Sequence, residues 1–155
     1  MLEALTLFHV VLSLIGIASG FAVVYGLLSS RVHGWTNLFI WTTVATSVTG
    51  FFFPFHKFLP SHGVGILSLI VLAIAILGLY RFRLAGGWRR TYAISVVIAL
   101  YFNVFVLVVQ LFLKVPSLNA LAPTQSEAPF QIAQGIVLIV FVVLGIRAAM
   151  KFRPA

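Results

Sequence analysis

Four histidines and several amide side chains are the groups in this chain whose types and spacing could form a chemical site. His9, His56 and His62 lie near the ends of three apolar segments that follow one another, whereas His33 lies apart. Four amides fall within or beside the later apolar segments: Asn103, Gln110, Gln131 and Gln134. Imidazoles ligate metals and amides donate and accept hydrogen bonds. If the segments pack side by side, these groups converge, and we predict that they form a cofactor-binding site.

Three kinds of ligand are compatible with this predicted site. Imidazoles from two helices could ligate a haem b, or imidazoles and amides could hydrogen-bond a quinone headgroup at the outer leaflet. A divalent metal fits least well, because no carboxylate lies at ligand spacing from any histidine. The haem interpretation is weakened because no His-x-x-x-His spacing occurs. An interpretation without a ligand also stands, in which His56 and His62 are interfacial residues that touch headgroups and loop carbonyls.

The segments that must position these groups are those of a membrane protein. The mean hydropathy is +1.17, and 62% of the residues are hydrophobic while 8% are charged. Water-soluble chains carry about 25% charged residues. Five apolar stretches approach the ~20 residues that a spanning helix needs, and we expect helices over 4–28, 35–53, 62–82, 91–113 and 128–150. The predicted fold is all-α, one transmembrane domain over residues 1–155 with five spanning helices.

The basic residues predict how this bundle is oriented. Ten lysines and arginines are present, and with five spans only Lys57 and Lys114 fall on one side. The other eight share the opposite side: Arg31, Arg81, Arg83, Arg89, Arg90, Arg147, Lys151 and Arg153. Cytoplasmic loops carry an excess of Lys and Arg, so we place the N-terminus outside and the C-terminus inside. The net charge of +8 is then this positive bias and not the mark of a nucleic-acid binder.

Four arginines of the loop between the third and fourth predicted helices form a candidate lipid-headgroup site. They are Arg81, Arg83, Arg89 and Arg90. A basic residue near an anionic membrane surface contributes ~1 kcal/mol of attraction. We therefore expect these arginines to contact anionic headgroups at the inner face. The alternative is that they only set the topology of the chain in the membrane.

Small residues in the first predicted helix indicate close helix packing. Gly16 and Gly20 form a GxxxG pattern, which lets two helix backbones approach closely. We expect both glycines to face a neighbouring helix. The partner is a helix of the same chain, a second copy in a homo-oligomer, or another membrane protein.

The sequence resembles small uncharacterised integral membrane proteins of proteobacteria over most of its length. The resemblance rests on Phe53-Pro54-Phe55-His56, on Pro60-Ser61-His62 and on the segments 101–110 and 114–130. It implies a location in a bacterial inner membrane. It implies no activity, because none is settled for that group.

Three functions remain open at this point. The first is a small membrane protein that binds haem b or a quinone at the outer-leaflet site. The second is an accessory or structural bundle that acts through partner transmembrane helices. The third is a small transporter or channel subunit, which is disfavoured because no charged residue in the middle of a predicted span marks an ion route. The chain has no cysteine and contains no HExxH, P-loop or nucleophile-elbow motif, which favours a role other than catalysis.

Overall fold

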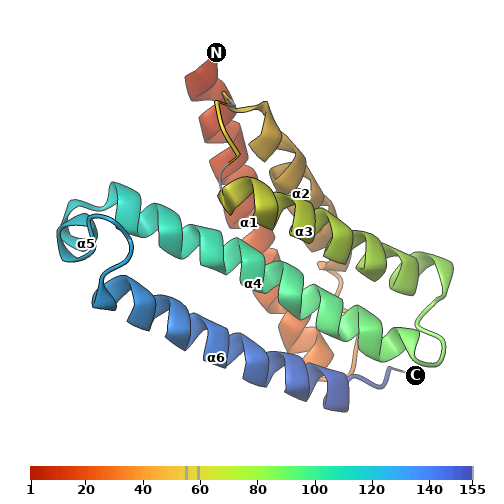
Figure 1. The fold of residues 1–155 in the computed structure, drawn as a ribbon. Helices are drawn as coiled ribbons and strands as arrows, with labels where there is room; N and C mark the ends of the chain where they lie inside the picture. The colour runs from red at the N-terminus through yellow and green to blue at the C-terminus, as the bar shows by residue number, and fades with distance from the viewer. Residues whose placement is uncertain (55, 59, 155) are drawn as a thin grey trace.

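The computed structural model describes residues 1–54, 56–58 and 60–154, and every regular element in them is helical (Figure 1). The elements are α1 (Leu2–Leu28), α2 (Thr36–Thr49), the 3-10 turn η1 (Gly50–Phe52), α3 (Pro60–Ile76), the π-helical turn η2 (Leu77–Arg81), α4 (Trp88–Lys114), α5 (Pro116–Leu121) and α6 (Ala128–Lys151).

Four helices are long and apolar enough to cross a membrane: α1, α3 continued by η2, α4, and α6. They contain 27, 22, 27 and 24 residues, above the ~20 that a spanning helix needs. A helix also satisfies its own backbone hydrogen bonds, as the hydrocarbon core requires. The chain is therefore a multi-pass, all-helical membrane protein.

The second predicted segment, 35–53, is shorter than these four. α2 has 14 residues and η1 adds three, so the helical run ends at Phe52. Phe53 is extended, with φ −70° and ψ 154°, because a residue before proline disfavours the helical conformation and Pro54 follows. Thr36–Phe52 thus lies at the lower limit of the ~17–25 residues of spanning helices.

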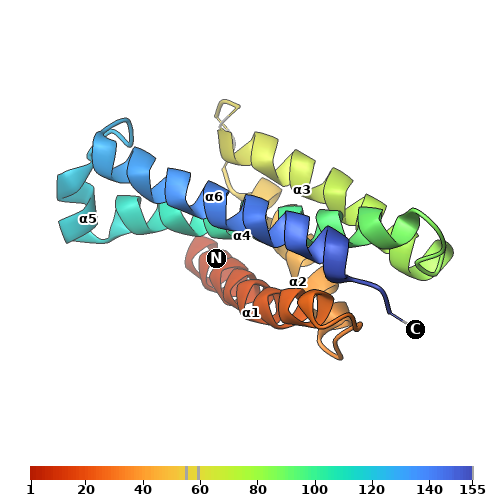
Figure 2. The same ribbon diagram turned by 90° about the horizontal axis from the view of Figure 1, so that it is seen from below.

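The helices pack around α4. α4 contacts α1, α3 and α6, while α2 contacts α1 and α3. Figures 1 and 2 show α3, α4 and α6 running side by side as one layer, which the pair α1 and α2 crosses obliquely. Gly16 and Gly20 lie at this crossing. They are buried against α2 and α4 of the same chain, which confirms that they face neighbouring helices.

Hydrogen bonds tie together the three segments that carry most of the positive charge. The Arg153 backbone N–H donates to Ser30 Oγ at 2.7 Å, and Arg89 Nη1 donates to the Phe152 carbonyl at 2.6 Å. The Tyr80 hydroxyl bonds to Asn37 Oδ1. We call this end of the molecule, formed by residues 29–35, 82–90 and 147–154, the basic end. The N-terminus and residues 53–54, 56–58 and 115–127 lie at the opposite end (Figure 1).

The buried core is displaced toward the basic end. Most of its apolar members come from the second half of α1, the first half of α2, the second half of α3 and the first half of α4: Val23, Val24, Leu27, Phe39, Ile40, Leu72, Ala75, Tyr92, Ala93, Val96, Val97, Ala99 and Leu100. Phe141 and Ala148 of α6 also belong to it. Phe152, which follows α6, is fully buried beside Tyr92 with ring centroids 5.7 Å apart. The opposite end has few buried side chains, Phe112 among them.

Candidate functional site

His9 is held against the end of α2. Its Nδ1 lies 2.8 Å from Thr49 Oγ1, and its ring meets Phe53 edge-on, with centroids 5.3 Å apart. His9 belongs to α1, two turns before Gly16, and is partly buried. The ring also lies close to Gly50, where a Cβ would be in ordinary van der Waals contact with His9 Cε1 at 3.6 Å.

The hydrogen bonds of Thr49 bear on the tautomer of the His9 ring. Thr49 Oγ1 lies 3.1 Å from the Thr46 carbonyl and 2.8 Å from His9 Nδ1. When the hydroxyl donates to the carbonyl, Nδ1 carries the ring proton and Nε2 is a bare acceptor. Among the described residues, Nε2 has no hydrogen-bond partner. His9 can therefore accept a hydrogen bond from a molecule outside the chain.

His62 and His56 are placed differently from His9. His62 is in the first turn of α3, 8% exposed, with its ring near those of Phe51 and Phe58 at centroid distances of 5.9 and 5.7 Å. His56 is exposed between α2 and α3. The segment between Gly50 and Phe53 thus contacts His9 through Phe53 and His62 through Phe51.

The amides engage groups of the chain itself. Asn103 Nδ2 donates to Thr43 Oγ1 at 3.3 Å, beside Gly16 at the crossing of α1, α2 and α4. Gln134 Nε2 donates to the Phe105 carbonyl at 3.1 Å, and Gln131 Nε2 to the Ser126 carbonyl at 2.9 Å.

Gln110 is exposed near the end of α4. The structure therefore brings His9 and His62 to one segment. It places Asn103 at the helix crossing and Gln131 and Gln134 along α6, where both bond to backbone carbonyls.

The four arginines of the candidate headgroup site separate into different environments. Arg89 is bonded to the Phe152 carbonyl, and the Arg81 guanidinium lies 5.6 Å from the centroid of the Phe82 ring. Arg83 is exposed, with a positive φ of 49°. Arg90 is exposed at the start of α4 and lines a groove.

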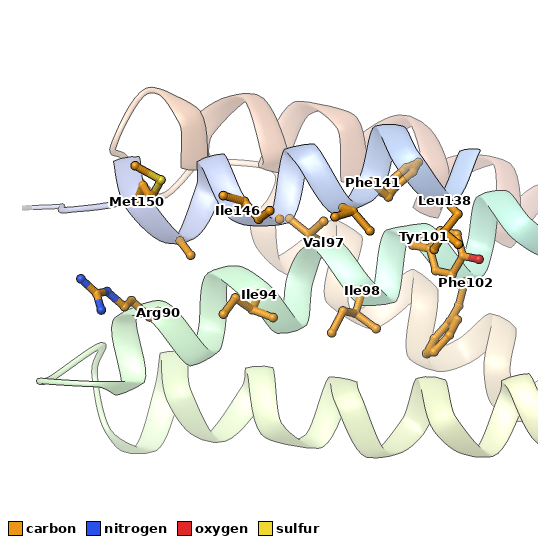
Figure 3. A pocket seen from close by; sticks show the side chains of 13 residues that line it. Arg90, Ile94, Val97, Ile98, Tyr101, Phe102, Leu138, Phe141, Ile146 and Met150 are labelled. Carbon is orange, nitrogen blue, oxygen red and sulfur yellow. The ribbon is translucent and has the colours of Figure 1, made fainter. Parts of the chain in front are cut away.

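This groove runs between α4 and α6 and has a volume of about 740 Å³ (Figure 3). Its walls are apolar side chains of both helices, and Arg90 stands at one end of it, on the side of Met150. Gly145 lies opposite Val97, where a Cβ would be 3.6 Å from Val97 Cγ1. The missing side chain at Gly145 and the small one at Ala149 leave the space that the groove occupies.

Sequence reasoning missed Thr49, Phe53 and the groove. Thr49 was visible only as one of several threonines in its helix, and its pairing with His9 depends on how α1 and α2 are rotated about their axes. The spacing of Gly145 and Ala149, four residues apart on one helix face, is the sequence signal that could have indicated the groove.

Comparison with protein-family models, curated proteins and solved structures finds no match to this chain. Within the part of the chain that the structure describes, no group of three or more His, Asp or Glu side chains is placed to hold a metal ion.

Proposed function

We propose that this chain is a five-span protein of a bacterial inner membrane that binds the headgroup of a lipid-soluble quinol at its outer end. The N-terminus would lie outside and the C-terminus inside, with α2 and η1 as the fifth span. The observation that supports the site is the His9–Thr49 hydrogen bond of 2.8 Å, which engages Nδ1 and leaves Nε2 for a ligand, as an acceptor when Nδ1 carries the proton. A quinol hydroxyl is a donor that matches it, and Phe53 offers an apolar ring beside it.

The same geometry favours a quinol over haem b. The haem hypothesis rests on a pair of imidazoles from two helices as axial ligands, whereas the His62 ring packs near Phe51 and Phe58 and His56 lies in an exposed connection. A quinol needs only one imidazole. Asn103, Gln131 and Gln134 would then act as structural amides.

Binding of a short-chain benzoquinol to the purified protein tests this proposal. Tryptophan fluorescence quenching in detergent should show saturable binding, which His9→Leu weakens about tenfold, the equivalent of one hydrogen bond of ~1.4 kcal/mol. Thr49→Val keeps the imidazole but removes its tether, so it should weaken binding by less. His33→Leu is the matched control at the basic end and should bind as the wild type does.

Two results would overturn the quinol proposal. A Soret band in the visible spectrum of the purified protein would select haem instead. Equal quinol affinity of the wild type and His9→Leu would show that the histidine is not part of a binding site.

A second candidate function, an accessory bundle, is favoured by the surface of α6. Of the residues of α6, Phe141 and Ala148 alone are buried, and Ile132 and Ile139 are 60% and 65% exposed. Gly16 and Gly20 are covered within the chain, so a partner helix or a second copy would dock on α6. Since the chain has no cysteine, Ile139→Cys offers a direct test. Disulfide-linked dimers formed in membranes would favour a second copy on this face, and their absence would disfavour it.

A further inference from the structure

The groove between α4 and α6 has apolar walls and one positive charge, that of Arg90, at one end. Thirteen residues line it, and Arg90 is the one charged residue among them. Its volume of about 740 Å³ falls within the ~300–1,000 Å³ of small-molecule pockets. In a membrane, the molecules that meet such a surface are lipids.

The length of the groove matches one leaflet of a bilayer. Arg90 and Phe102 are the first and last residues of α4 that line it, and they are 12 positions apart, or about 18 Å along a helix. Half of the hydrocarbon core is ~15 Å. Figure 3 shows Arg90 at one end of the trough and Phe102 at the other, so the charge lies at the depth of headgroups when the apolar part lies among acyl chains.

Two further cations stand near the same end. A second hollow is lined by Arg147, Lys151 and three apolar residues, and it shares Ile146 and Met150 with the groove. Arg147 and Lys151 are four residues apart and therefore lie on one face of α6. Three basic side chains thus surround the region where the two hollows meet.

No carboxylate side chain of the protein can neutralise these cations. The sequence contains two acidic residues, Glu3 and Glu127. Glu3 is in the first turn of α1 and Glu127 immediately precedes α6, so both lie at the end of the molecule away from the basic end. No side chain of the protein therefore supplies a counter-charge at the basic end, and a bound anion would find these cations available.

We propose that this groove binds one acyl chain of an anionic phospholipid, with the lipid phosphate on Arg90 and with Arg147 and Lys151 beside it. The apolar walls of α4 and α6 exclude water from the acyl chain. Arginine presents a fork of N–H donors that matches phosphate geometry, which explains why the residue at the mouth of the groove is an arginine.

Native mass spectrometry of the delipidated full chain tests this proposal. Phosphatidylglycerol and phosphatidylcholine with identical acyl chains are titrated separately, and we expect one phosphatidylglycerol to bind more tightly than phosphatidylcholine. Arg90→Gln should weaken phosphatidylglycerol about fivefold, the effect of one basic residue near a lipid headgroup, and phosphatidylcholine by less, because the choline cation offsets the charge of its phosphate. Arg83→Gln removes another exposed arginine of the same end that does not line the groove, and it should weaken phosphatidylglycerol by less than Arg90→Gln does.

A second variant tests the acyl-chain part of the site. Ile94→Trp fills the groove one turn beyond Arg90 and should weaken both lipids. Ile94 is 41% exposed, so the larger ring does not disturb the core. Met150→Trp, at a position 65% exposed that also lines the groove, provides the same test if the first variant fails to fold.

Three outcomes would overturn the proposal. They are equal binding of the two lipids by the wild type, equal losses in Arg83→Gln and Arg90→Gln, and unchanged lipid binding when both tryptophan variants fold. Inorganic phosphate distinguishes a lipid from a free anion. If phosphate alone displaces phosphatidylglycerol at comparable concentration, Arg90 is an anion site without an acyl-chain groove.

Discussion

Gly20 marks the tightest approach of α1 to its neighbours. A Cβ there would lie 2.6 Å from Leu100 Cδ1 and 2.8 Å from Phe39 Cε1, closer than such atoms can stand. Overpacking costs ~1–3 kcal/mol, and the better helix propensity of alanine returns less than ~1 kcal/mol. Gly20→Ala should therefore lower the free energy of unfolding by ~1–2 kcal/mol, measured by denaturant titration in detergent micelles.

Gly135→Ala is the matched control for this substitution. Gly135 is also helical, but nothing lies within 4 Å of its ideal Cβ. The change should leave the stability equal or slightly raised. A loss in Gly135→Ala as large as in Gly20→Ala would mean that close packing is not what Gly20 provides.

Gln134 contains a buried acceptor that no group satisfies. Its Nε2 donates to the Phe105 carbonyl at 3.1 Å, but its Oε1 is buried with no partner in the part of the chain that is described. A hydrogen bond contributes ~0.5–1.5 kcal/mol, and an unsatisfied buried group costs ~1–3 kcal/mol. Gln134→Leu should thus raise the unfolding free energy by up to ~1 kcal/mol in the same titration.

The exposed Gln131, which bonds to the Ser126 carbonyl, gives the comparison for this prediction. Gln131→Leu should change the stability by less than ~0.5 kcal/mol, as surface substitutions do. If Gln134→Leu instead destabilises the protein by more than ~1 kcal/mol, Oε1 has a partner from outside the chain and Gln134 returns as a ligand-binding candidate.

Among the elements, the connection from α5 to α6 is organised by one carboxylate. Glu127 accepts hydrogen bonds from Thr124 Oγ1 at 2.8 Å and from the backbone N–H groups of Thr124 and Ser126. The Thr124 hydroxyl bond, followed by the smaller backbone contributions, lowers the pKa of Glu127 below its ordinary value of 4.5. The ionised form is the one that is stabilised.

The order of this connection should therefore depend on pH. With a lowered folded-state pKa, the stabilisation is complete above about pH 4.5 and is lost as the pH falls through the folded value. A ¹³C NMR titration of the Glu127 carboxyl group should give a midpoint below 4.5, and Thr124→Val should move it upward. A midpoint at or above 4.5 in the wild type would contradict the hydrogen-bonded arrangement.

The elements also show what sequence reasoning could and could not reach. The four long helices were predicted because their apolar runs contain no charge, and they are confirmed. The end of α2 at Thr49 was missed by a few residues, because a 3-10 turn before Pro54 resembles helix in hydropathy. The π-helical turn at Leu77–Arg81 was not predicted, because hydropathy does not distinguish it from α-helix. Gly78 in this turn packs on Trp88 and Tyr92, and such contacts exist only after folding.

The site was predictable only in its residue types. His9 was predicted as a site residue near the end of its apolar segment, but its bond to Thr49 was not predicted. Which acceptors Asn103 and Gln134 would find was not predictable, because it depends on the rotation of each helix. Asn103, Gln131 and Gln134 bond to groups close to them in the fold and not to the histidines.

At the scale of the whole molecule, the proposed topology has a direct test. The chain has no cysteine, so Leu2→Cys, Lys57→Cys and Ala85→Cys can each be probed singly with a membrane-impermeant maleimide in intact spheroplasts. Five spans with the N-terminus outside predict labelling at positions 2 and 57, and labelling at position 85 only after permeabilisation. The excess of basic residues on the side of position 85 is the reason.

Each alternative topology gives its own pattern in this experiment. If α2 does not cross, positions 2 and 57 fall on opposite sides of the membrane. If the orientation is reversed, position 85 alone is labelled in intact cells. The unmodified chain, which has no cysteine, is the control for background labelling.

The displacement of the core toward the basic end gives the bundle a gradient of local stability. Backbone amides that exchange with solvent only through rare, large openings should lie where Val23 and Val96 are buried. Those near Phe8 and Val109, where few side chains are buried, should exchange through smaller and more frequent fluctuations. His9 lies in this early-opening half, so a ligand could enter at that end while the other half of the bundle stays closed.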